Sequence, residues 1–168
     1  MIIKHTNYSN GVHEIEFNEP CSEIDLEEPF FGNVDVKCRM DKSSYQIVLD
    51  IDAKAQVVFE CDRCTKEYES TIEGKFQLVC LYREEDVSEE DINIKYLPPE
   101  QDKIDISEDL MEYLILNIPM KKICREKCKG LCPKCGADLN EKTCNCDKNS
   151  TNPVWEPLLK LKEKLNNN

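Results

Sequence analysis

The feature that most constrains this chain is a dense run of cysteines between residues 124 and 146. Six cysteines lie there with the spacing Cys-x3-Cys-x3-Cys-x2-Cys-x8-Cys-x-Cys, and a further Cys-x2-Cys pair, Cys61 and Cys64, lies upstream. A Cys-x2-Cys turn presents two thiolates from one bend, and tetrahedral Zn²⁺ takes four sulfur ligands at about 2.3 Å. These eight thiols therefore predict one or two structural zinc ions.

Several divisions of the eight cysteines give four ligands per ion, and we favour one of them. Its first set is Cys61, Cys64, Cys124 and Cys128, and its second set is Cys132, Cys135, Cys144 and Cys146. Residues 132–136 have the pattern of a tight metal-binding turn, because Pro133 fixes one backbone dihedral and Gly136 tolerates a positive φ. The remaining cysteines are expected to bind no metal: Cys21, Cys38 and Cys80.

The residue types around these cysteines argue against catalysis. A catalytic zinc keeps one position open for water and uses His or carboxylate ligands, whereas His5 and His13 lie far from the cysteines, in a strand-like region. A thioredoxin-like Cys-x2-Cys pair begins a helix, but residues 65–69 continue the β pattern after Cys64. We therefore expect a protein that is not an enzyme, with a thiol redox enzyme as the weaker alternative.

Charge limits the partners that the chain can bind by itself. The formal net charge is −12, yet residues 121–150 carry eight Lys or Arg against four Asp or Glu. Proteins that grip phosphate backbones unaided are usually basic, so contact with RNA would be local to this segment. The residues that would make it are Lys121, Lys122, Arg125, Lys127, Lys129 and Lys134.

The sequence also predicts a compartment. It begins without a signal-peptide pattern, and no apolar run approaches the roughly 18 residues that a membrane-spanning helix needs. We expect a cytoplasmic protein that does not bind membranes. In a reducing compartment a dense cysteine pattern indicates metal binding more often than disulfides.

Periodicity predicts an α+β fold. Residues 34–59 alternate as strands with a hairpin turn at 41–44, and the pattern resumes after Cys64, which places Cys61 and Cys64 at a hairpin tip. We expect a mainly antiparallel sheet, with barrel-like closure as one arrangement, and one covering helix. The expected units are a β-rich domain at 1–120, a zinc-binding module at 121–150, and a C-terminal helix and tail at 151–168.

Two helices and one loop are expected outside the strands. The first helix, 107–118, bridges the sheet and the zinc module; Ser107 is its expected N-cap, and Pro119 ends it. Six acids among residues 84–91 favour a solvated loop, with an interaction surface as the alternative. The second helix carries an apolar stripe that could pack on the domain or bind a partner: Trp155, Leu158, Leu161 and Leu165.

Several ordered motifs together resemble the YceD family, the large ribosomal RNA subunit accumulation proteins. They are Cys-Asp-Arg-Cys at 61–64, Ile-Asp-Ile at 104–106 leading into a helix, and the cysteine pattern from 124 onward with its Leu-Asn at 139–140. The resemblance covers roughly residues 30 to 165. One departure is Asn-Pro-Val at 152–154, where many relatives have Asp-Pro-Arg, so a salt bridge between that Asp and Arg is not expected here.

The resemblance implies a non-enzymatic role in the synthesis, processing or stability of large-subunit ribosomal RNA. Because the chain is acidic, we expect it to act through a basic ribosomal protein or a large-subunit assembly intermediate. A module that binds the RNA directly is the alternative.

Overall fold

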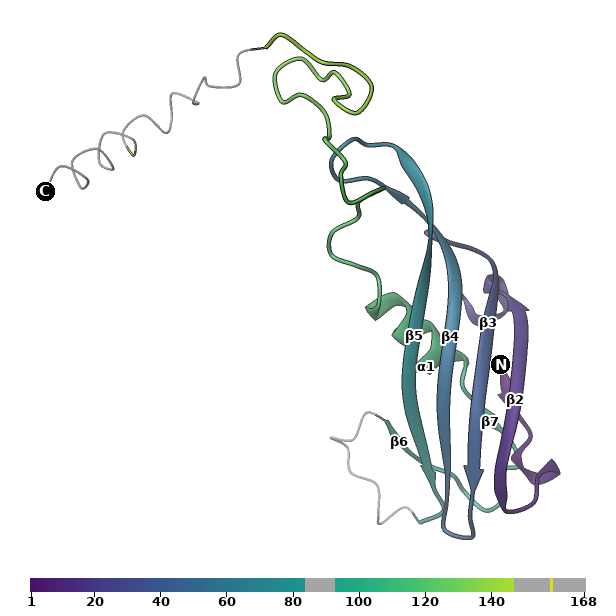
Figure 1. Ribbon diagram of the computed structural model, residues 1–168. Helices are drawn as coiled ribbons and strands as arrows, with labels where there is room; N and C mark the ends of the chain where they lie inside the picture. Colours follow the sequence, from purple (N-terminus) through teal and green to yellow (C-terminus); the bar gives the residue numbers. More distant parts are fainter. Residues whose placement is uncertain (84–92, 147–157, 159–168) are drawn as a thin grey trace, which may run out of the picture.

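The chain folds around an open sheet of five strands in the computed structural model, which describes residues 1–83, 93–146 and Leu158 (Figure 1). Four long strands are antiparallel neighbours in chain order: β2 (Gly11–Pro20), β3 (Phe30–Lys42), β4 (Gln46–Glu60) and β5 (Glu67–Leu81). The short strand β6 (Ile94–Tyr96) lies parallel to β5.

Smaller elements lie beside this sheet. Strands β1 (Ile2–Ile3) and β7 (Ile104–Asp105) pair with each other. Two 3-10 turns, η1 (His5–Asn7) and η2 (Cys21–Ile24), flank β2, and one helix, α1 (Ser107–Leu116), follows β7.

Strict alternation of buried and more exposed residues builds the sheet. Every second residue of β4 from Ile47 to Phe59 is buried, and the residues between them are half-buried or exposed, as expected for a sheet with one face on the core. A hairpin turn joins β3 and β4 as predicted, but it begins later than residue 41, because Asp41 and Lys42 still belong to β3. In this turn the Ser43 hydroxyl accepts a hydrogen bond from the N–H of Gln46 at 3.1 Å, which ends β3 and starts β4.

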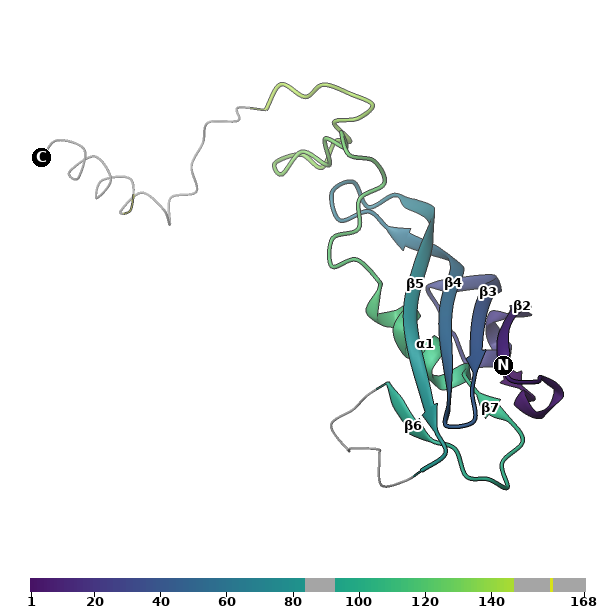
Figure 2. The ribbon, with the colours of Figure 1, turned by 60° about the horizontal axis from the view of Figure 1, so that its bottom comes forward.

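Helix α1 covers the buried face of β4 and β5 (Figure 2). Leu110 and Leu114 are completely buried. Gly74 leaves room for the helix, because a Cβ added there would already contact Leu114 at 3.7 Å. The ring of Phe76 stacks on Tyr113 at 4.2 Å between centroids. The predicted single covering helix is therefore present, and it ends two residues earlier than expected.

The start of α1 corrects one prediction. Ser107 is not the N-cap, because the helix begins at Ser107 and the preceding Ile106 makes no side-chain cap. Instead, the carboxylate of Asp105 accepts a hydrogen bond from the N–H of Ser107 at 3.0 Å. The first turn also contains Glu108 and Asp109, which the helix dipole favours.

The sheet is open, which corrects the expectation of a barrel-like closure. Closure would require β2 to pair with the last strand of the sheet, but β6 has three residues and pairs with β5. The inner face is covered by α1 and η2 instead, so its apolar residues are buried without closing the sheet.

Some predictions fall outside the described residues. They are the acidic run at 84–91 and, apart from Leu158, the C-terminal segment at 151–168.

Both histidines have structural contacts. The Nε2 atom of His5 lies 2.8 Å from the carbonyl oxygen of Gln101, and the Nε2 atom of His13 lies 2.8 Å from the carbonyl oxygen of Ser9. Within the described part of the chain, no helix is long and apolar enough to cross a membrane.

Candidate metal centre

Two groups of four thiols lie at and beyond the tip of the β4–β5 hairpin. The first group is Cys61, Cys64, Cys124 and Cys128, and the second is Cys132, Cys135, Cys144 and Cys146; within each group all sulfur atoms lie within 4.8 Å of one another. The structure thus brings the eight cysteines together in the division favoured from spacing. That they bind metal stays a prediction.

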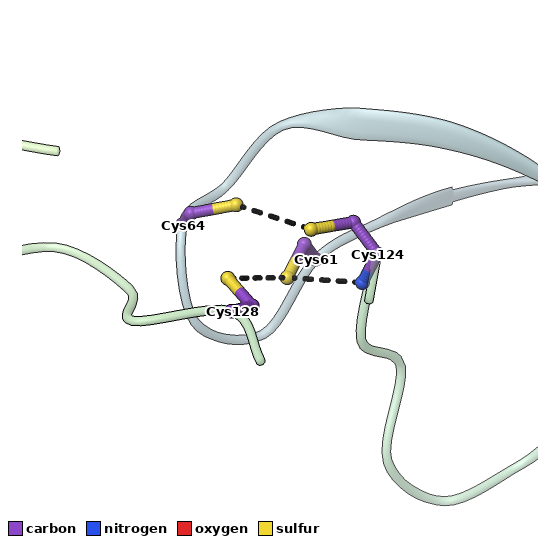
Figure 3. Close-up of side chains that lie close together, drawn as sticks. All are labelled: Cys61, Cys64, Cys124 and Cys128. Atoms are coloured by element: carbon purple, nitrogen blue, oxygen red, sulfur yellow. Dashed lines mark hydrogen bonds between the residues drawn. The ribbon is translucent and has the colours of Figure 1, made fainter. Parts of the chain in front are cut away.

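The first group has the dimensions of a tetrahedral metal site (Figure 3). The Sγ atoms of Cys61 and Cys128 are 3.9 Å apart, and those of Cys64 and Cys124 are 3.7 Å apart. Four sulfurs at about 2.3 Å from a central Zn²⁺ would be separated by about 3.8 Å. A disulfide needs about 2.0 Å, and all four cysteines are free. The thiols present fit a zinc ion.

The hairpin tip that carries Cys61 and Cys64 is a tight, strained turn. The N–H of Thr65 donates to the carbonyl of Cys61 at 2.8 Å, and the N–H of Cys61 donates to the backbone carbonyl of Lys66 at 2.9 Å. Thr65 has a φ of 56°, which is unfavourable for a β-branched residue. Strain of this kind persists only where the surroundings hold it, and here both flanking strands and the facing segment do so.

Backbone hydrogen bonds hold the segment after α1 against this tip. The N–H of Asp62 donates to the carbonyl of Lys122 at 2.8 Å, and the N–H of Lys122 donates back to the Asp62 carboxylate at 2.7 Å. The N–H of Leu131 donates to the carbonyl of Arg63 at 2.8 Å. Gly130 permits this approach, because a Cβ there would lie 2.7 Å from the Arg63 carbonyl oxygen.

The second group is local and more exposed. The carbonyl of Cys132 accepts the N–H of Gly136 at 2.9 Å, and Gly136 has a φ of 71°, so the tight turn predicted at 132–136 is confirmed. Cys132 is buried and Cys135 is exposed, whereas in the first group three thiols are at most 3% exposed. All four members come from 15 consecutive residues, and the described chain forms no named strand or helix there.

Backbone N–H groups prepare thiols of both groups for ionisation. The N–H of Cys124, 3.4 Å from Sγ of Cys61, lowers the pKa of Cys61 to about 6. The N–H groups of Cys135 and Lys134 lower the pKa of Cys132 to about 6. Although burial by itself would raise it, the pKa of Cys128 is lowered too, because hydrogen bonds from the Asn140 amide and the N–H of Gly130 outweigh the effect of burial.

Neighbouring thiols resist further ionisation. Burial and the hydrogen bond with Cys61 raise the pKa of Cys124 to about 12, and contact with Cys135 followed by burial raises the pKa of Cys146 to about 12. A second thiolate beside the first is therefore unfavourable unless a cation neutralises both.

Sequence reasoning missed the polar residues that support the first group. The amide of Asn140 donates to Sγ of Cys128 at 3.5 Å and its oxygen accepts the N–H of Lys129 at 2.8 Å. The Arg63 guanidinium donates to the Cys128 carbonyl at 2.8 Å. Lys66 forms ion pairs with Asp138, at 3.1 Å, and with Glu141. Spacing gives no signal for these contacts, because they form only when the three segments meet.

The six basic residues named from sequence surround the thiol groups. Lys122 lies with Nζ 5.1 Å from the ring centroid of Phe59, and the other five are exposed: Lys121, Arg125, Lys127, Lys129 and Lys134. In the described ranges none of the six forms an ion pair. The acids Asp138 and Glu141 are instead paired with Lys66 of the sheet domain.

The three cysteines expected to bind no metal lie in the core of the sheet domain, away from both groups. Burial raises the pKa of Cys38 to about 12 and that of Cys80 to about 11, and it also raises the pKa of Cys21. These thiols stay protonated and serve as small apolar residues.

Fold and site together define a class: an open five-stranded sheet with two four-thiol groups at and beyond the tip of its longest hairpin, each of which could hold one metal ion. The chain belongs to the YceD family, described as "Large ribosomal RNA subunit accumulation protein YceD", whose family model matches residues 49–162. The matched range contains both thiol groups, α1, and the β4–β5 hairpin except for the first three residues of β4.

Similar proteins come from plants and bacteria. A chloroplastic large ribosomal RNA subunit accumulation protein, YCED homolog 1 of Arabidopsis thaliana, is 28% identical over 170 residues, which cover 78% of this chain and 52% of that protein. The protein YlbN of Bacillus subtilis, which has no described function, is 29% identical over 150 residues, covering 88% of this chain and 84% of YlbN. No solved structure matches the chain.

The chain spans about half the length of the Arabidopsis relative.

Proposed function

We propose that this chain is a non-enzymatic, zinc-binding ribosome-biogenesis protein needed for the synthesis, processing or accumulation of large-subunit ribosomal RNA. The observation that carries the proposal is the family match over residues 49–162. The Arabidopsis relative is named for the same process. The cytoplasmic location expected from sequence stays a prediction.

The thiol groups support zinc in a structural role. Zinc and iron–sulfur clusters favour thiolate ligands, whereas Mg²⁺ and Ca²⁺ favour oxygen. Four thiols around one ion leave no position for water, which is typical of structural zinc. The first group joins the hairpin tip to the segment after α1, so the ion would fix the second group and its basic residues relative to the sheet.

Charge supports action through a basic ribosomal protein or a large-subunit assembly intermediate. The formal net charge of the chain is −12, and outside residues 121–150 it is −16. A surface of this sign attracts basic proteins and repels RNA over most of its area.

A second candidate function, direct binding of ribosomal RNA, is favoured by the basic residues around the thiol groups. Residues 121–134 hold six Lys or Arg and one Glu, and the six make no ion pair within the described chain. Each phosphate contact would contribute a slope of about −0.7 to the dependence of log affinity on log salt for single-stranded RNA. Lys127→Glu should weaken such binding, whereas Lys103→Glu, an exposed lysine at the other end of the sheet, should not.

Depletion of the protein tests the proposed function. The expected result is a fall in the ratio of large- to small-subunit ribosomal RNA. Wild-type protein and Cys21→Ala, which changes an unligated cysteine, should restore the ratio, and Cys64→Ala should not. An unchanged ratio on depletion would overturn the proposal.

Affinity purification of the tagged protein, with and without ribonuclease, separates the two candidate functions. A ribosomal protein or a large-subunit intermediate that stays bound after ribonuclease supports a protein partner. Loss of all partners after ribonuclease supports direct RNA binding.

A further inference from the structure

The outer strand β2 has a free edge along its whole length. All ten of its residues pair with β3, from Gly11 opposite Lys42 to Pro20 opposite Asn33, without a register shift. In an antiparallel pair every second residue directs its N–H and C=O away from the partner strand. In the described chain no other strand pairs with β2 and no backbone hydrogen bond reaches its residues from elsewhere. Figures 1 and 2 show β2 at the border of the sheet.

The inner face of β2 is apolar at its centre, between His13 and Glu19, and is incompletely covered. Ile15 and Phe17 pack against the core but are only half-buried. Their partners on β3, Cys38 and Val36, are at most 1% exposed. One further strand beside β2 would therefore bury the apolar atoms that the five-stranded sheet leaves in water.

The outer face of β2 is acidic. Glu14 lies opposite Arg39 in the register, but Arg39 forms its ion pair with Asp50 at 3.2 Å. Glu16 pairs with Lys37 at 3.5 Å, and both side chains are more than 70% exposed. The outer face of β2 therefore offers two carboxylates to basic side chains on an added strand.

The same charges argue against a second copy of this chain at the edge. Two β2 strands side by side would bring Glu14 and Glu16 against the same residues of the other copy, and like charges across a strand pair are destabilising. Exposed edge strands commonly use charge to prevent such pairing. The complementary occupant is a strand with Lys or Arg on one face.

The sheet has another open edge, on the part of β5 beyond β6, and it differs from β2. Its outer face also carries acids, among them Glu69, but its inner face is covered by α1. Ile72 and Phe76 of β5 are at most 8% exposed. A strand added there would meet one half-buried aromatic side chain on this face, Tyr68, whereas β2 offers Ile15 and Phe17, so β2 is the favoured edge.

We propose that the β2 edge binds an extended basic segment of a protein partner by strand addition, with apolar side chains over Ile15 and Phe17 and Lys or Arg beside Glu14 and Glu16. Main-chain hydrogen bonds would hold the segment and the alternating side chains would select it. This inference rests on the proposed function in one respect: it specifies how a basic ribosomal protein would be recognised.

The test uses the full-length zinc-loaded protein and a ten-residue peptide of alternating Lys and Val. Binding is measured by calorimetry, and amide exchange locates it on β2. Two further peptides carry N-methyl groups on alternate residues, one set on the odd and one on the even positions. Strand addition predicts that one methylated peptide binds like the parent and the other does not, because only one set of N–H groups faces the protein.

Matched charge reversals place the site. Glu14→Lys should weaken peptide binding about tenfold, because an attractive cross-strand pair becomes a repulsive one. Glu69→Lys, the same change at the β5 edge, should alter binding less than twofold. Both residues are exposed and form no ion pair in the described ranges, so both variants should fold.

Three outcomes would each overturn the strand-addition proposal. They are no binding of the parent peptide, an equal loss of binding with both methylated peptides, and an equal effect of Glu14→Lys and Glu69→Lys. These measurements use purified components and do not involve ribosomal RNA levels. If the peptide tests fail but depletion lowers the ratio of large- to small-subunit ribosomal RNA, the proposed function stands and strand addition is overturned. If the peptide binds as expected but depletion leaves that ratio unchanged, the proposed function alone is overturned.

Discussion

Substitution of Gly130 by alanine tests how the second thiol group is held to the hairpin tip. Gly130 has a φ of +75°, and a Cβ there would lie 2.7 Å from the carbonyl oxygen of Arg63, a backbone atom that also accepts the N–H of Leu131 at 2.8 Å. The added methyl group therefore meets an atom that cannot move without breaking a hydrogen bond. Gly32 is the matched control, since its φ is +72° and a Cβ there would contact nothing within 4 Å.

The two variants separate backbone strain from steric overlap. A left-handed φ costs an alanine about 1–2 kcal/mol, so Gly32→Ala should lower the free energy of unfolding by that amount. Gly130→Ala adds an overlap of the overpacking kind, about 1–3 kcal/mol, for a total loss of about 2–5 kcal/mol. Because Cys128 lies two residues before Gly130, this variant should also release metal from the first group faster.

Urea unfolding of the zinc-loaded proteins, followed by circular dichroism, gives the free energies of unfolding. Metal release to a chromogenic chelator gives the second readout. If Gly130→Ala is as stable as Gly32→Ala and releases metal at the wild-type rate, the close approach of Gly130 to Arg63 does not hold the module.

Three further predictions concern the thiols. A chelator should remove metal from the second group before the first, because Cys135 is exposed while Cys61 is 1% exposed; native mass spectrometry of each intermediate checks the order. Log metal affinity should fall more steeply with falling pH below about 6 than above it. The pKa of Cys61 is lowered to about 6, so Cys61 is already a thiolate above that pH, whereas below it the thiol must release a proton to bind metal; equal slopes in a competition titration from pH 5 to 8 would contradict this. Iodoacetamide should label Cys38 only after unfolding, because burial raises its pKa to about 12; peptide mapping of the native protein would expose any labelling.

The parts of the molecule that could be predicted are those that depend on local patterns in the sequence. Alternation of apolar residues gave the β3–β4–β5 strands, and the position of Cys61 and Cys64 between two such runs gave the hairpin tip. Counting four ligands per ion allowed several groupings of the thiols, and the favoured one is the grouping that the structure has. The positive φ of Gly136 followed from the turn that its neighbours require.

The remaining features depend on how distant segments meet. Whether a sheet closes is decided by how its last strand pairs and by what covers its inner face. The sequence indicates a covering helix, but it does not show that β6 pairs with β5 or that α1 lies over β4 and β5. The cap of α1 came from Asp105 because Ser107 already begins the helix. Asn140 supports Cys128 only through a contact across 12 positions in the chain. No periodic pattern of residues in the sequence indicates such a contact.

The length of the β4–β5 hairpin has an electrostatic consequence. Each strand has fifteen residues, about 50 Å at about 3.4 Å per residue. The segment that carries the basic residues at 121–134 lies at and beyond the tip, and the acidic strands lie behind it (Figure 1). The basic residues at one end and the acidic strands at the other give the molecule a dipole, and two zinc–tetrathiolate sites at the basic end, each with a charge of about −2, would weaken it. In the field of a polyanion such a molecule turns before contact, so that the thiol-rich end leads and the acidic sheet trails toward solvent.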